Sequence, residues 1–491
     1  MAEEQDKKLV FNTRRIELDQ PSGDAKAKLV ASRFNKILKI AEGKWIFFNG
    51  LTSAMAVLDT GGYSLYKSLI SREKTPSHVT SPVEEGLLLG KFLVHEDFDE
   101  IAYLKVSSQH HRFADRNFIL TILPTLGCNF ACDYCYQDKQ EMMTKMDGSV
   151  RNAIKKMVED RAAAGDFPGL EVTWYGGEPT IGWDVISDLS EHFIQLSERF
   201  GFKYGAGIIT NGYLLTQKHI GDMLRFNISF VQITLDGPRE YHDTRRVLKN
   251  GAGTFDRVIN NISSFIGTSI QVSIRVNVDH RNKDGIRGLI NSLVEAGLSN
   301  QPNISVNFAR VTAKTKPSHG VAGFCLSNKD FAKDVLEYYT WAEEAGLATQ
   351  PRPSLRPVTC AAIKPNTLIV EPDGTLQKCW DLVGFREYSI GNILDTPSFD
   401  LSPRHLTWLS WDPFDQQQEC FSCTWLPNCM GGCPLRILYP ELSPDGKIRL
   451  ECTSFKYNWK EAFKKIVEST SNAQQAKATT HAYLESETER G

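Results

Sequence analysis

The sequence predicts an α/β protein built around a parallel sheet that rolls into a partial or full barrel. The main observation is an alternation of apolar runs, which we interpret as strands, with helical patterns between them. The runs cover residues 118–123, 170–175, 206–210, 228–235, 270–278 and 304–311. Six such units predict a parallel sheet, although a closed barrel has eight. A second observation is a cysteine-rich region after this repeat, which predicts a further domain.

Bulk properties exclude several classes of function. The chain has 491 residues, 41% of them hydrophobic, and a net charge of −3. This balance gives no general electrostatic reason to bind nucleic acid or an anionic membrane. No apolar run is long enough to span a membrane, and residues 1–8 lack the apolar core of a signal peptide. We therefore expect a cytoplasmic protein.

Residues 1–115 are expected to form a small α+β module. Residues 1 to about 40 carry few organising signals, and order is expected to begin with a strand and tight turn at 45–50. Ser81, Pro82 and Glu84 then form a capping box for a helix that ends near Gly90. A short strand at 92–94 follows. The module resembles the leader-peptide recognition element of peptide-modifying enzymes, a small winged-helix unit that binds an extended peptide along a sheet edge. The alternative is a domain that only covers the barrel.

The strand ends of the central domain carry the unusual residues. A cysteine loop follows the first strand, and Gly176-Gly177-Glu178-Pro179 follows the second. Thr210-Asn211-Gly212 closes the third strand, Asp236-Gly237-Pro238 closes the fourth, and Arg275 and Asn277 lie late in the fifth. Active sites of such barrels lie at the carboxyl ends of the strands, so these residues are expected to face one mouth.

The cysteine loop holds three thiols, Cys128, Cys132 and Cys135, within eight residues. In a reducing compartment such a group predicts a metal site before a disulfide. Three thiolates hold three irons of a four-iron, four-sulfur cluster and leave the fourth iron open. A zinc site would need a fourth nearby Cys or His, which the loop does not supply. Three unrelated core cysteines remain the other interpretation.

This loop resembles the signature of the radical S-adenosylmethionine (radical SAM) family, and the resemblance extends over residues 45–460. It implies an open barrel of six units, a partial (β/α)6 barrel. It also implies that the open iron chelates S-adenosylmethionine and that its cleavage yields a 5′-deoxyadenosyl radical, which removes a hydrogen atom from the substrate. The electron would come from an external donor, a flavodoxin or ferredoxin.

Several residues match positions of the family's cofactor pocket. The Gly176–Pro179 segment resembles the second family motif, in which Glu178 is a possible acceptor for the ammonium group. Thr234 and Arg246 belong to a block common in relatives with a C-terminal SPASM extension, with Thr234 expected at the ribose and Arg246 at the carboxylate. The remaining candidates for this pocket are Tyr134, Thr210, Asn211, Arg275 and Asn277.

A second cysteine field lies in residues 313–467, which we assign to a linker and a SPASM domain. The resemblance implies one auxiliary four-iron cluster on Cys420, Cys423, Cys429 and Cys452, and another on Cys360, Cys379 and Cys433. With the cluster that binds S-adenosylmethionine, this makes three. No further cysteine lies near Cys360, so the last cluster is expected to have an open iron or a non-cysteine ligand. A zinc ribbon is the alternative for the two close cysteine pairs.

Two residues depart from the sulfatase-maturing relatives. Those relatives carry an aspartate base directly after the cysteine that matches Cys379, whereas here Trp380 takes that place and Asp381 follows it. They also carry glutamine where this chain has Tyr175. We therefore retain Asp381 as a candidate catalytic base. Both departures argue against a formylglycine-generating enzyme.

The complete pattern predicts a maturase of ribosomally made peptides that recognises the leader sequence of a precursor. The expected product is an oxidative crosslink, either a thioether or a carbon–carbon bond. The alternative enzyme is a maturase of a protein target, such as a sulfatase or a quinone-cofactor dehydrogenase subunit. A hypothesis of another class is an iron–sulfur electron-transfer protein without radical chemistry. Residues 116–312 would form the barrel, and residues 468–491 a flexible tail.

Overall fold

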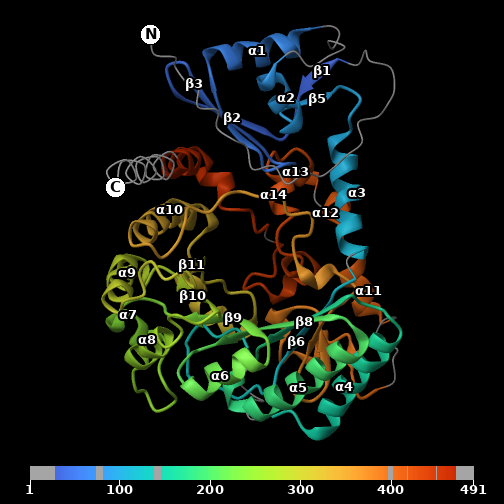
Figure 1. Ribbon diagram of the computed structural model, residues 1–491, viewed down its shortest axis with the longest axis vertical. Helices are drawn as coiled ribbons and strands as arrows, with labels where there is room; N and C mark the ends of the chain where they lie inside the picture. The colour runs from blue at the N-terminus through green and yellow to red at the C-terminus, as the bar shows by residue number, and fades with distance from the viewer. Residues whose placement is uncertain are drawn as a thin grey trace, which may run out of the picture.

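The computed structural model describes residues 28–72, 81–114, 116–137, 145–395, 402–416, 418–448 and 450–470. In Figure 1 the N-terminal module lies at the top, the strand–helix repeat at the bottom, and helices of the cysteine-rich region lie between them. Most of the predicted tail falls outside the described residues.

The N-terminal module is a small sheet with helices. Its elements are β1 (Leu29–Ala31), β2 (Asn35–Ala41), β3 (Lys44–Asn49), β4 (Met55–Asp59), α1 (Thr60–Ser71), α2 (Pro82–Leu89), β5 (Leu93–His95) and α3 (Glu100–Phe113). Strands β2, β3 and β4 form an antiparallel sheet, and β1 pairs with β5. The Ser81 side chain accepts a hydrogen bond from the Glu84 backbone N–H and Gly90 caps α2, so the predicted helix is confirmed.

The apolar run in β3 is buried on both faces of this sheet. Phe47 packs toward α1 and α2 in one core cluster. Ile46 and Phe48 point the other way, toward Trp425 and the helical residues 455–470. Because successive side chains alternate across a strand, a fully apolar run indicates two covered faces.

The expectation that residues 1 to about 40 carry little organisation is wrong in part. Strands β1 and β2 already lie between Leu29 and Ala41. The side chains of β2 are half-buried or exposed along its length. A strand without a buried face lacks the period-2 signal that sequence patterns depend on.

The strand–helix repeat forms the expected parallel sheet. Its elements are β6 (Phe118–Ile122), α4 (Gly148–Ala163), β7 (Gly169–Trp174), α5 (Trp183–Phe200), β8 (Lys203–Thr210), α6 (Gln217–Arg225), β9 (Ile228–Thr234), α7 (Arg239–Arg245), α8 (Phe255–Ser263), β10 (Gln271–Val278), α9 (Ile286–Glu295), β11 (Ile304–Arg310) and α10 (Asn328–Glu344). Strands β6 to β11 lie side by side in sequence order, and every neighbouring pair is parallel. The predicted α/β fold is confirmed, and the sheet stays open at β11.

The C-terminal region continues the same sheet. Its elements are β12 (Thr367–Val370), β13 (Thr375–Gln377), β14 (Gly391–Asn392), α11 (Pro403–Ser410), α12 (Pro413–Gln416), α13 (Gln418–Phe421), α14 (Leu426–Cys429) and α15 (Leu435–Leu438). Strand β12 runs parallel to β6, and β13 and β14 follow as antiparallel strands. This arrangement brings the second cysteine field beside the first strand of the repeat.

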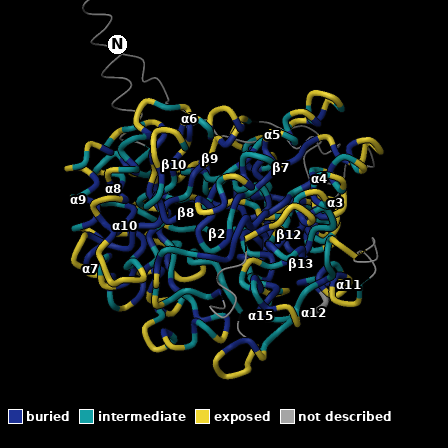
Figure 2. The backbone as a smooth tube through the Cα atoms, turned by 90° about the horizontal axis from the view of Figure 1, so that it is seen from below, coloured by how far each residue is buried: buried dark blue, intermediate teal, exposed yellow. Residues whose placement is uncertain are grey.

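The core lies between the sheet and its covering helices, where Figure 2 shows the strands mostly buried. On β10, Val272, Ile274 and Val276 are at most 1% exposed. The residues between them are only half-buried, because they face the inside of the curved sheet. The inner face thus stays accessible to a ligand.

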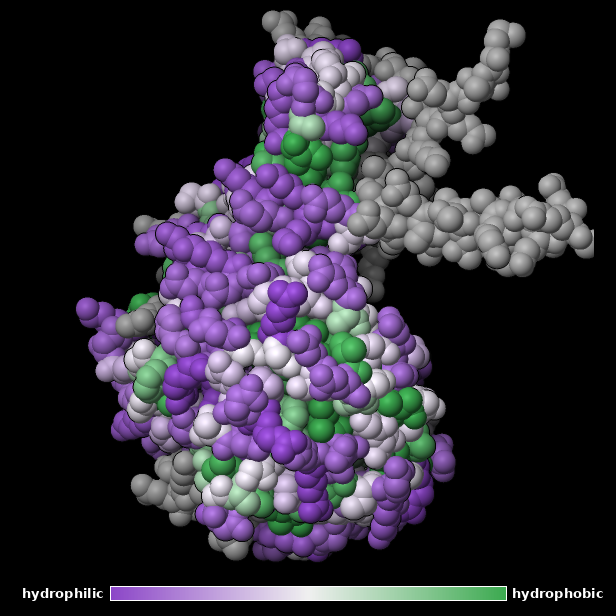
Figure 3. All heavy atoms as spheres, turned by 90° about the vertical axis from the view of Figure 1, so that its left-hand side faces the viewer, coloured by the Kyte–Doolittle hydropathy of each residue, from purple (hydrophilic) through white to green (hydrophobic). Residues whose placement is uncertain are grey.

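None of the helices among the described residues is both long and apolar enough to cross a membrane. In Figure 3 hydrophilic residues cover most of the visible face, and the apolar ones are scattered.

Candidate functional site

The three cysteines Cys128, Cys132 and Cys135 lie in the loop after β6 and are free thiols. The loop is held against the segment after α7, where the Ala131 backbone N–H donates to Val247 O at 2.9 Å. Burial raises the pKa of Cys128 to about 12, and it raises the pKa of Cys132 as well. Thiolates in such a place need nearby positive charge, and iron supplies it. The donor set therefore fits an iron–sulfur cluster.

The Gly176–Gly177 turn lies directly against this loop. The Gly177 backbone N–H donates to Thr125 O at 3.1 Å, and Glu178 N–H donates to Gly127 O at 2.8 Å. A Cβ on Gly177 would collide with the carbonyl oxygens of Leu126 and Gly127. The sequence assigned these glycines to the cofactor pocket, and both line the cavity, but their close approach in the structure is to the chain itself. They set the position at which the cysteine loop begins.

Glu178 is fully buried beneath the cavity. Its carboxylate accepts hydrogen bonds from the Thr210 hydroxyl at 2.6 Å and from Asn211 N–H at 2.7 Å. The hydroxyl and N–H of Thr180 also donate to it, at 2.6 and 3.1 Å. Glu178 thus ties the ends of β7 and β8 together, and its predicted contact with the cofactor ammonium remains a prediction. Pro179 begins the short 3₁₀ helix that follows and is also buried.

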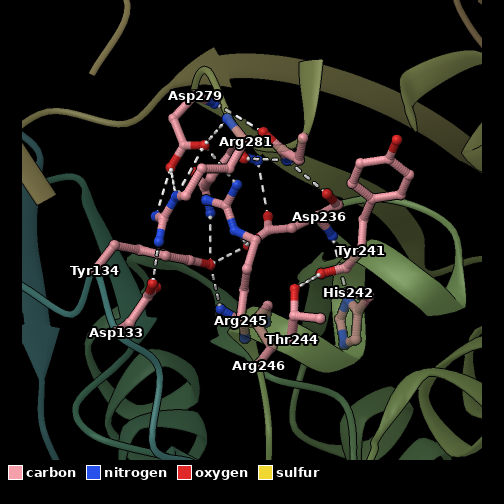
Figure 4. A network of polar contacts seen from close by, with 12 residues as sticks. Asp133, Tyr134, Asp236, Tyr241, His242, Thr244, Arg245, Arg246, Asp279 and Arg281 are labelled. Carbon is pink, nitrogen blue, oxygen red and sulfur yellow. Dashed lines mark hydrogen bonds and ion pairs between the residues drawn. The ribbon is translucent and has the colours of Figure 1, made fainter. Parts of the chain in front are cut away.

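A buried polar network supports Tyr134 from behind (Figure 4). The Tyr134 hydroxyl donates to Asp236 and accepts from Arg246 at 2.7 Å. Asp279 accepts from Arg245 at 3.0 Å and from Arg281 at 2.7 Å. Arg281 in turn pairs with Asp133 of the cysteine loop.

This network was not expected from the sequence beyond Tyr134 and Arg246. Arg245 and Asp279 are 3% and 0% exposed. Two adjacent arginines at the end of a short helix are a weak signal, because only a structure shows that both are buried. The network fixes the cysteine loop against the ends of β9 and β10, and that placement is its role.

One cavity of about 380 Å³ brings most of the predicted residues together. The predicted residues that line it are Cys128, Cys132, Tyr134, Cys135, Gly176, Gly177, Thr210, Asn211, Thr234, Arg246, Arg275, Asn277 and Asp381. Glu178 and Pro179 lie outside the lining. The wall also contains residues that the sequence did not single out, among them Tyr136, Gln137, Gln232, Arg310 and Lys314.

Asp381 forms an ion pair with Lys314 Nζ at 2.9 Å on the cavity wall. The pKa of Lys314 is raised chiefly by the charge of Asp381. Beside this pair, Tyr175 and Trp380 stack with ring centroids 5.1 Å apart, and the Tyr136 and Tyr175 hydroxyls are hydrogen-bonded. Tyr175 and Trp380, the two departures from the sulfatase-maturing pattern, therefore lie side by side in the cavity lining. Whether Asp381 acts as a base remains a prediction.

The second cysteine field divides into two groups. Cys420, Cys423, Cys429 and Cys452 line one small cavity. In the other group, burial raises the pKa of Cys379 well above its usual value, and the charges of Asp381, Cys433 and Cys360 raise it further. This spatial grouping matches the two predicted ligand sets. Among the residues that the structure describes, no three Cys, His, Asp or Glu side chains converge on a point suited to a single metal ion.

Cys325 belongs to neither group. Its thiol donates a hydrogen bond to Val321 O at 3.4 Å, and burial raises the pKa of that thiol.

Comparison with known proteins agrees with the resemblance to radical SAM enzymes that the sequence motifs show. Residues 122–293 match the radical SAM superfamily. The chain is 22% identical to a cysteine-type anaerobic sulfatase-maturating enzyme of Clostridium perfringens, across 70% of this chain and 96% of that protein. It is 24% identical to a serine-type enzyme of Bacteroides thetaiotaomicron, across 62% of this chain and 80% of that protein.

The solved structures show the same fold. A structure described as native anSMEcpe with bound AdoMet and Kp18Cys peptide superimposes with a TM-score of 0.57. The identity is 19%, and the match covers 73% of this chain and 99% of that one.

Proposed function

Because the chain carries a radical SAM domain and is an enzyme, we propose that it matures a ribosomally synthesised precursor peptide by forming an oxidative intramolecular crosslink. The observation that carries this proposal is the composition of the cavity wall. Three free cysteines and the predicted cofactor residues line the same cavity as Tyr175, Trp380, Lys314 and Asp381. The last four residues are not needed to hold the cofactor and are available to contact a substrate side chain.

Each group on the cofactor side has a proposed task. Cys128, Cys132 and Cys135 would hold a four-iron cluster that, with S-adenosylmethionine, supplies the 5′-deoxyadenosyl radical. Arg246 would bind the methionyl carboxylate, and Thr234 would bind the ribose. The buried network behind Tyr134 keeps the loop in one position and excludes water.

The second cysteine field would hold two auxiliary clusters, whose chemistry is electron uptake or binding of the substrate. An external flavodoxin or ferredoxin supplies the first electron. The N-terminal module binds the leader of the precursor along a sheet edge, because strands β2 and β4 each pair only with β3 among the described strands.

The second candidate is a maturase of a protein target. The similarity to two sulfatase-maturating enzymes, across 96% and 80% of their length, favours it. Those enzymes are not the only relatives, since the chain is also 21% identical to a radical SAM cyclopropyl synthase of Paramaledivibacter caminithermalis, across 65% of that protein.

Coexpression with candidate precursor peptides, followed by tandem mass spectrometry, tests the proposal. We expect a loss of two hydrogens localised to one residue pair. The triple variant Cys128→Ala, Cys132→Ala, Cys135→Ala is the control and should leave the peptide unchanged. If no peptide changes mass while a coexpressed sulfatase is converted, the second candidate is correct. If no 5′-deoxyadenosine forms above the control, the radical function itself is wrong.

A further inference from the structure

Four cations line the cavity, and two of them already have a carboxylate partner. Lys314 pairs with Asp381 at 2.9 Å, and Arg310 pairs with Glu451. Among the residues that the structure describes, no carboxylate lies within ion-pair distance of Arg246 or Arg275. Burying a guanidinium is costly unless an anion accompanies it. The cavity is therefore prepared for two anionic groups from its ligands.

The two unpaired arginines reach the cavity from different elements, since Arg246 follows α7 and Arg275 belongs to β10. The charges of Tyr134 and Asp236 act on both, but their remaining neighbours differ. Arg246 is tied to the cysteine loop, since it lies over the ring of Phe130 at 5.4 Å. The charge of the Cys132 thiolate also acts strongly on Arg246. Arg246 is thus at the cluster end, where the proposed function places the single carboxylate of S-adenosylmethionine.

Arg275 projects from the inner face of the curved sheet. Its strand, β10, buries Val272, Ile274 and Val276 against the helices, so Arg275 lies on the opposite face and lines the cavity. The groups whose charges act most on it are Asp236, Tyr134, Tyr339 and Tyr175. Tyr175 stacks on Trp380 in the part of the cavity lining that the proposed function assigns to the substrate.

The guanidinium of Arg275 has one hydrogen-bond partner among the described residues, and its other donors have none. Its Nε donates to Asn277 Oδ1 at 3.2 Å, and no other side-chain hydrogen bond of Arg275 is found within the described ranges. Asp236 acts on Arg275 through its charge but forms no ion pair with it among the described residues, and its oxygens accept from Tyr134 and the Asn277 N–H. The two terminal nitrogens of Arg275 remain available, in the planar geometry that suits a carboxylate.

We propose that Arg275 binds a carboxylate of the peptide substrate, so that the modified residue lies next to an aspartate, a glutamate or the chain terminus. This inference rests on the proposed action on a peptide. It also changes the expected role of Arg275, which the sequence placed among the cofactor contacts.

Protection of Arg275 from phenylglyoxal, read by peptide mapping of the wild-type holoenzyme, tests the proposal. The probes are S-adenosylmethionine alone and four pools of octapeptides of otherwise random sequence. The first pool is capped at its C-terminus and contains a fixed aspartate or glutamate, and the second is capped and has asparagine or glutamine at that position. The third pool has asparagine or glutamine in place of acidic side chains and a free C-terminus. The fourth pool is the third with its C-terminus capped. We expect at least tenfold protection by a pool with a carboxylate and none by S-adenosylmethionine or the matched amides.

Substitutions of Arg275 give an independent readout if phenylglyoxal cannot reach its side chain. Arg275→Gln should bind S-adenosylmethionine within about threefold of wild type, since Arg246 holds that carboxylate, but should lose the tenfold preference for the acidic pool. Arg275→Lys should keep part of that preference, because it keeps the charge. Arg287→Gln, an exposed position on α9, should behave as wild type.

Two results overturn the inference. One is a tenfold loss of S-adenosylmethionine affinity in Arg275→Gln, which would make Arg275 a cofactor residue. The other is equal binding of the acidic and amide pools by the wild-type enzyme. Failure of the proposed function looks different, because no peptide would then be modified although S-adenosylmethionine binds and is cleaved.

Discussion

The carboxylate of Glu178 accepts a hydrogen bond from the Thr210 hydroxyl at 2.6 Å, and this contact joins the carboxyl ends of β7 and β8. Burial raises the pKa of Glu178, while its donors Thr180, Thr210 and Asn211 lower it. Four donors on one buried carboxylate form a rigid joint directly under the cofactor side of the cavity. In the structure, Glu178 therefore fixes the positions of the backbone at the ends of β7 and β8.

Glu178→Gln should damage this joint. An amide offers one acceptor oxygen and directs its NH₂ group at donors, so at least one buried donor loses its partner. Each such loss costs about 1–3 kcal/mol. We expect a lower melting temperature and weaker binding of S-adenosylmethionine, measured by thermal unfolding and equilibrium dialysis. Glu171→Gln, an exposed position on β7, is the matched control. Unchanged stability of Glu178→Gln would show that these hydrogen bonds do not hold the ends of β7 and β8 together.

Gly177→Ala should displace the cysteine loop. The added Cβ meets the backbone at Leu126 and Gly127, which cannot move without shifting Cys128. We expect the variant to fold but to lose most of its iron in the first site, about four atoms per chain. The measurement is iron content together with the yield of 5′-deoxyadenosine.

The matched control for this glycine is Gly205→Ala, because a Cβ at Gly205 has open space around it. If Gly177→Ala retained full iron content and activity, the close packing of the two loops would not matter for the cluster.

Two cysteines of the second field should affect different signals. Cys429 lines a cavity with Cys420, Cys423 and Cys452, whereas the charge of Cys433 acts on Cys360 and Cys379. We therefore expect Cys429→Ala and Cys452→Ala to remove one electron paramagnetic resonance signal, and Cys433→Ala to remove another. Loss of the same signal in all three variants would show that one cluster uses both groups.

Much of the fold could be predicted because it follows from local periodicity. Strands β6 to β11 are apolar and lie between amphipathic helices, so their order and direction follow from the pattern. Strand β2 escaped prediction, since none of its side chains is fully buried. Helix α10 was also missed, because it follows the last strand of the repeat and has no strand after it to mark a further unit.

The candidate site was predictable where residues follow a strand end. Thr210, Thr234 and Arg275 all reach the cavity, as the topology of parallel strands requires. Lys314 and its partner Asp381 are 67 residues apart, and no sequence pattern links positions at that separation. Pairing of charges across the fold is a tertiary property, and it decides which cations stay available to a ligand.

The buried carboxyl group of Glu371 should make stability depend on pH. Its Oε2 accepts the Gly384 N–H at 3.0 Å, while Oε1 is buried with no partner found among the described residues. Burial raises the pKa of Glu371 to about 7. The folded protein therefore binds a proton that the unfolded chain releases near its ordinary pKa of about 4.3.

The sign of the effect follows from this difference. Between about pH 4.3 and pH 7 the folded state holds more protons than the unfolded state, so this group makes the free energy of unfolding fall as pH rises. The stabilisation is complete below that range and is lost through it, by at most about 4 kcal/mol. Glu371→Gln keeps the shape without the proton, so its unfolding free energy should lack this component. Denaturant unfolding of both proteins at pH 5 and pH 8 measures the difference, and parallel pH profiles would disprove the raised pKa.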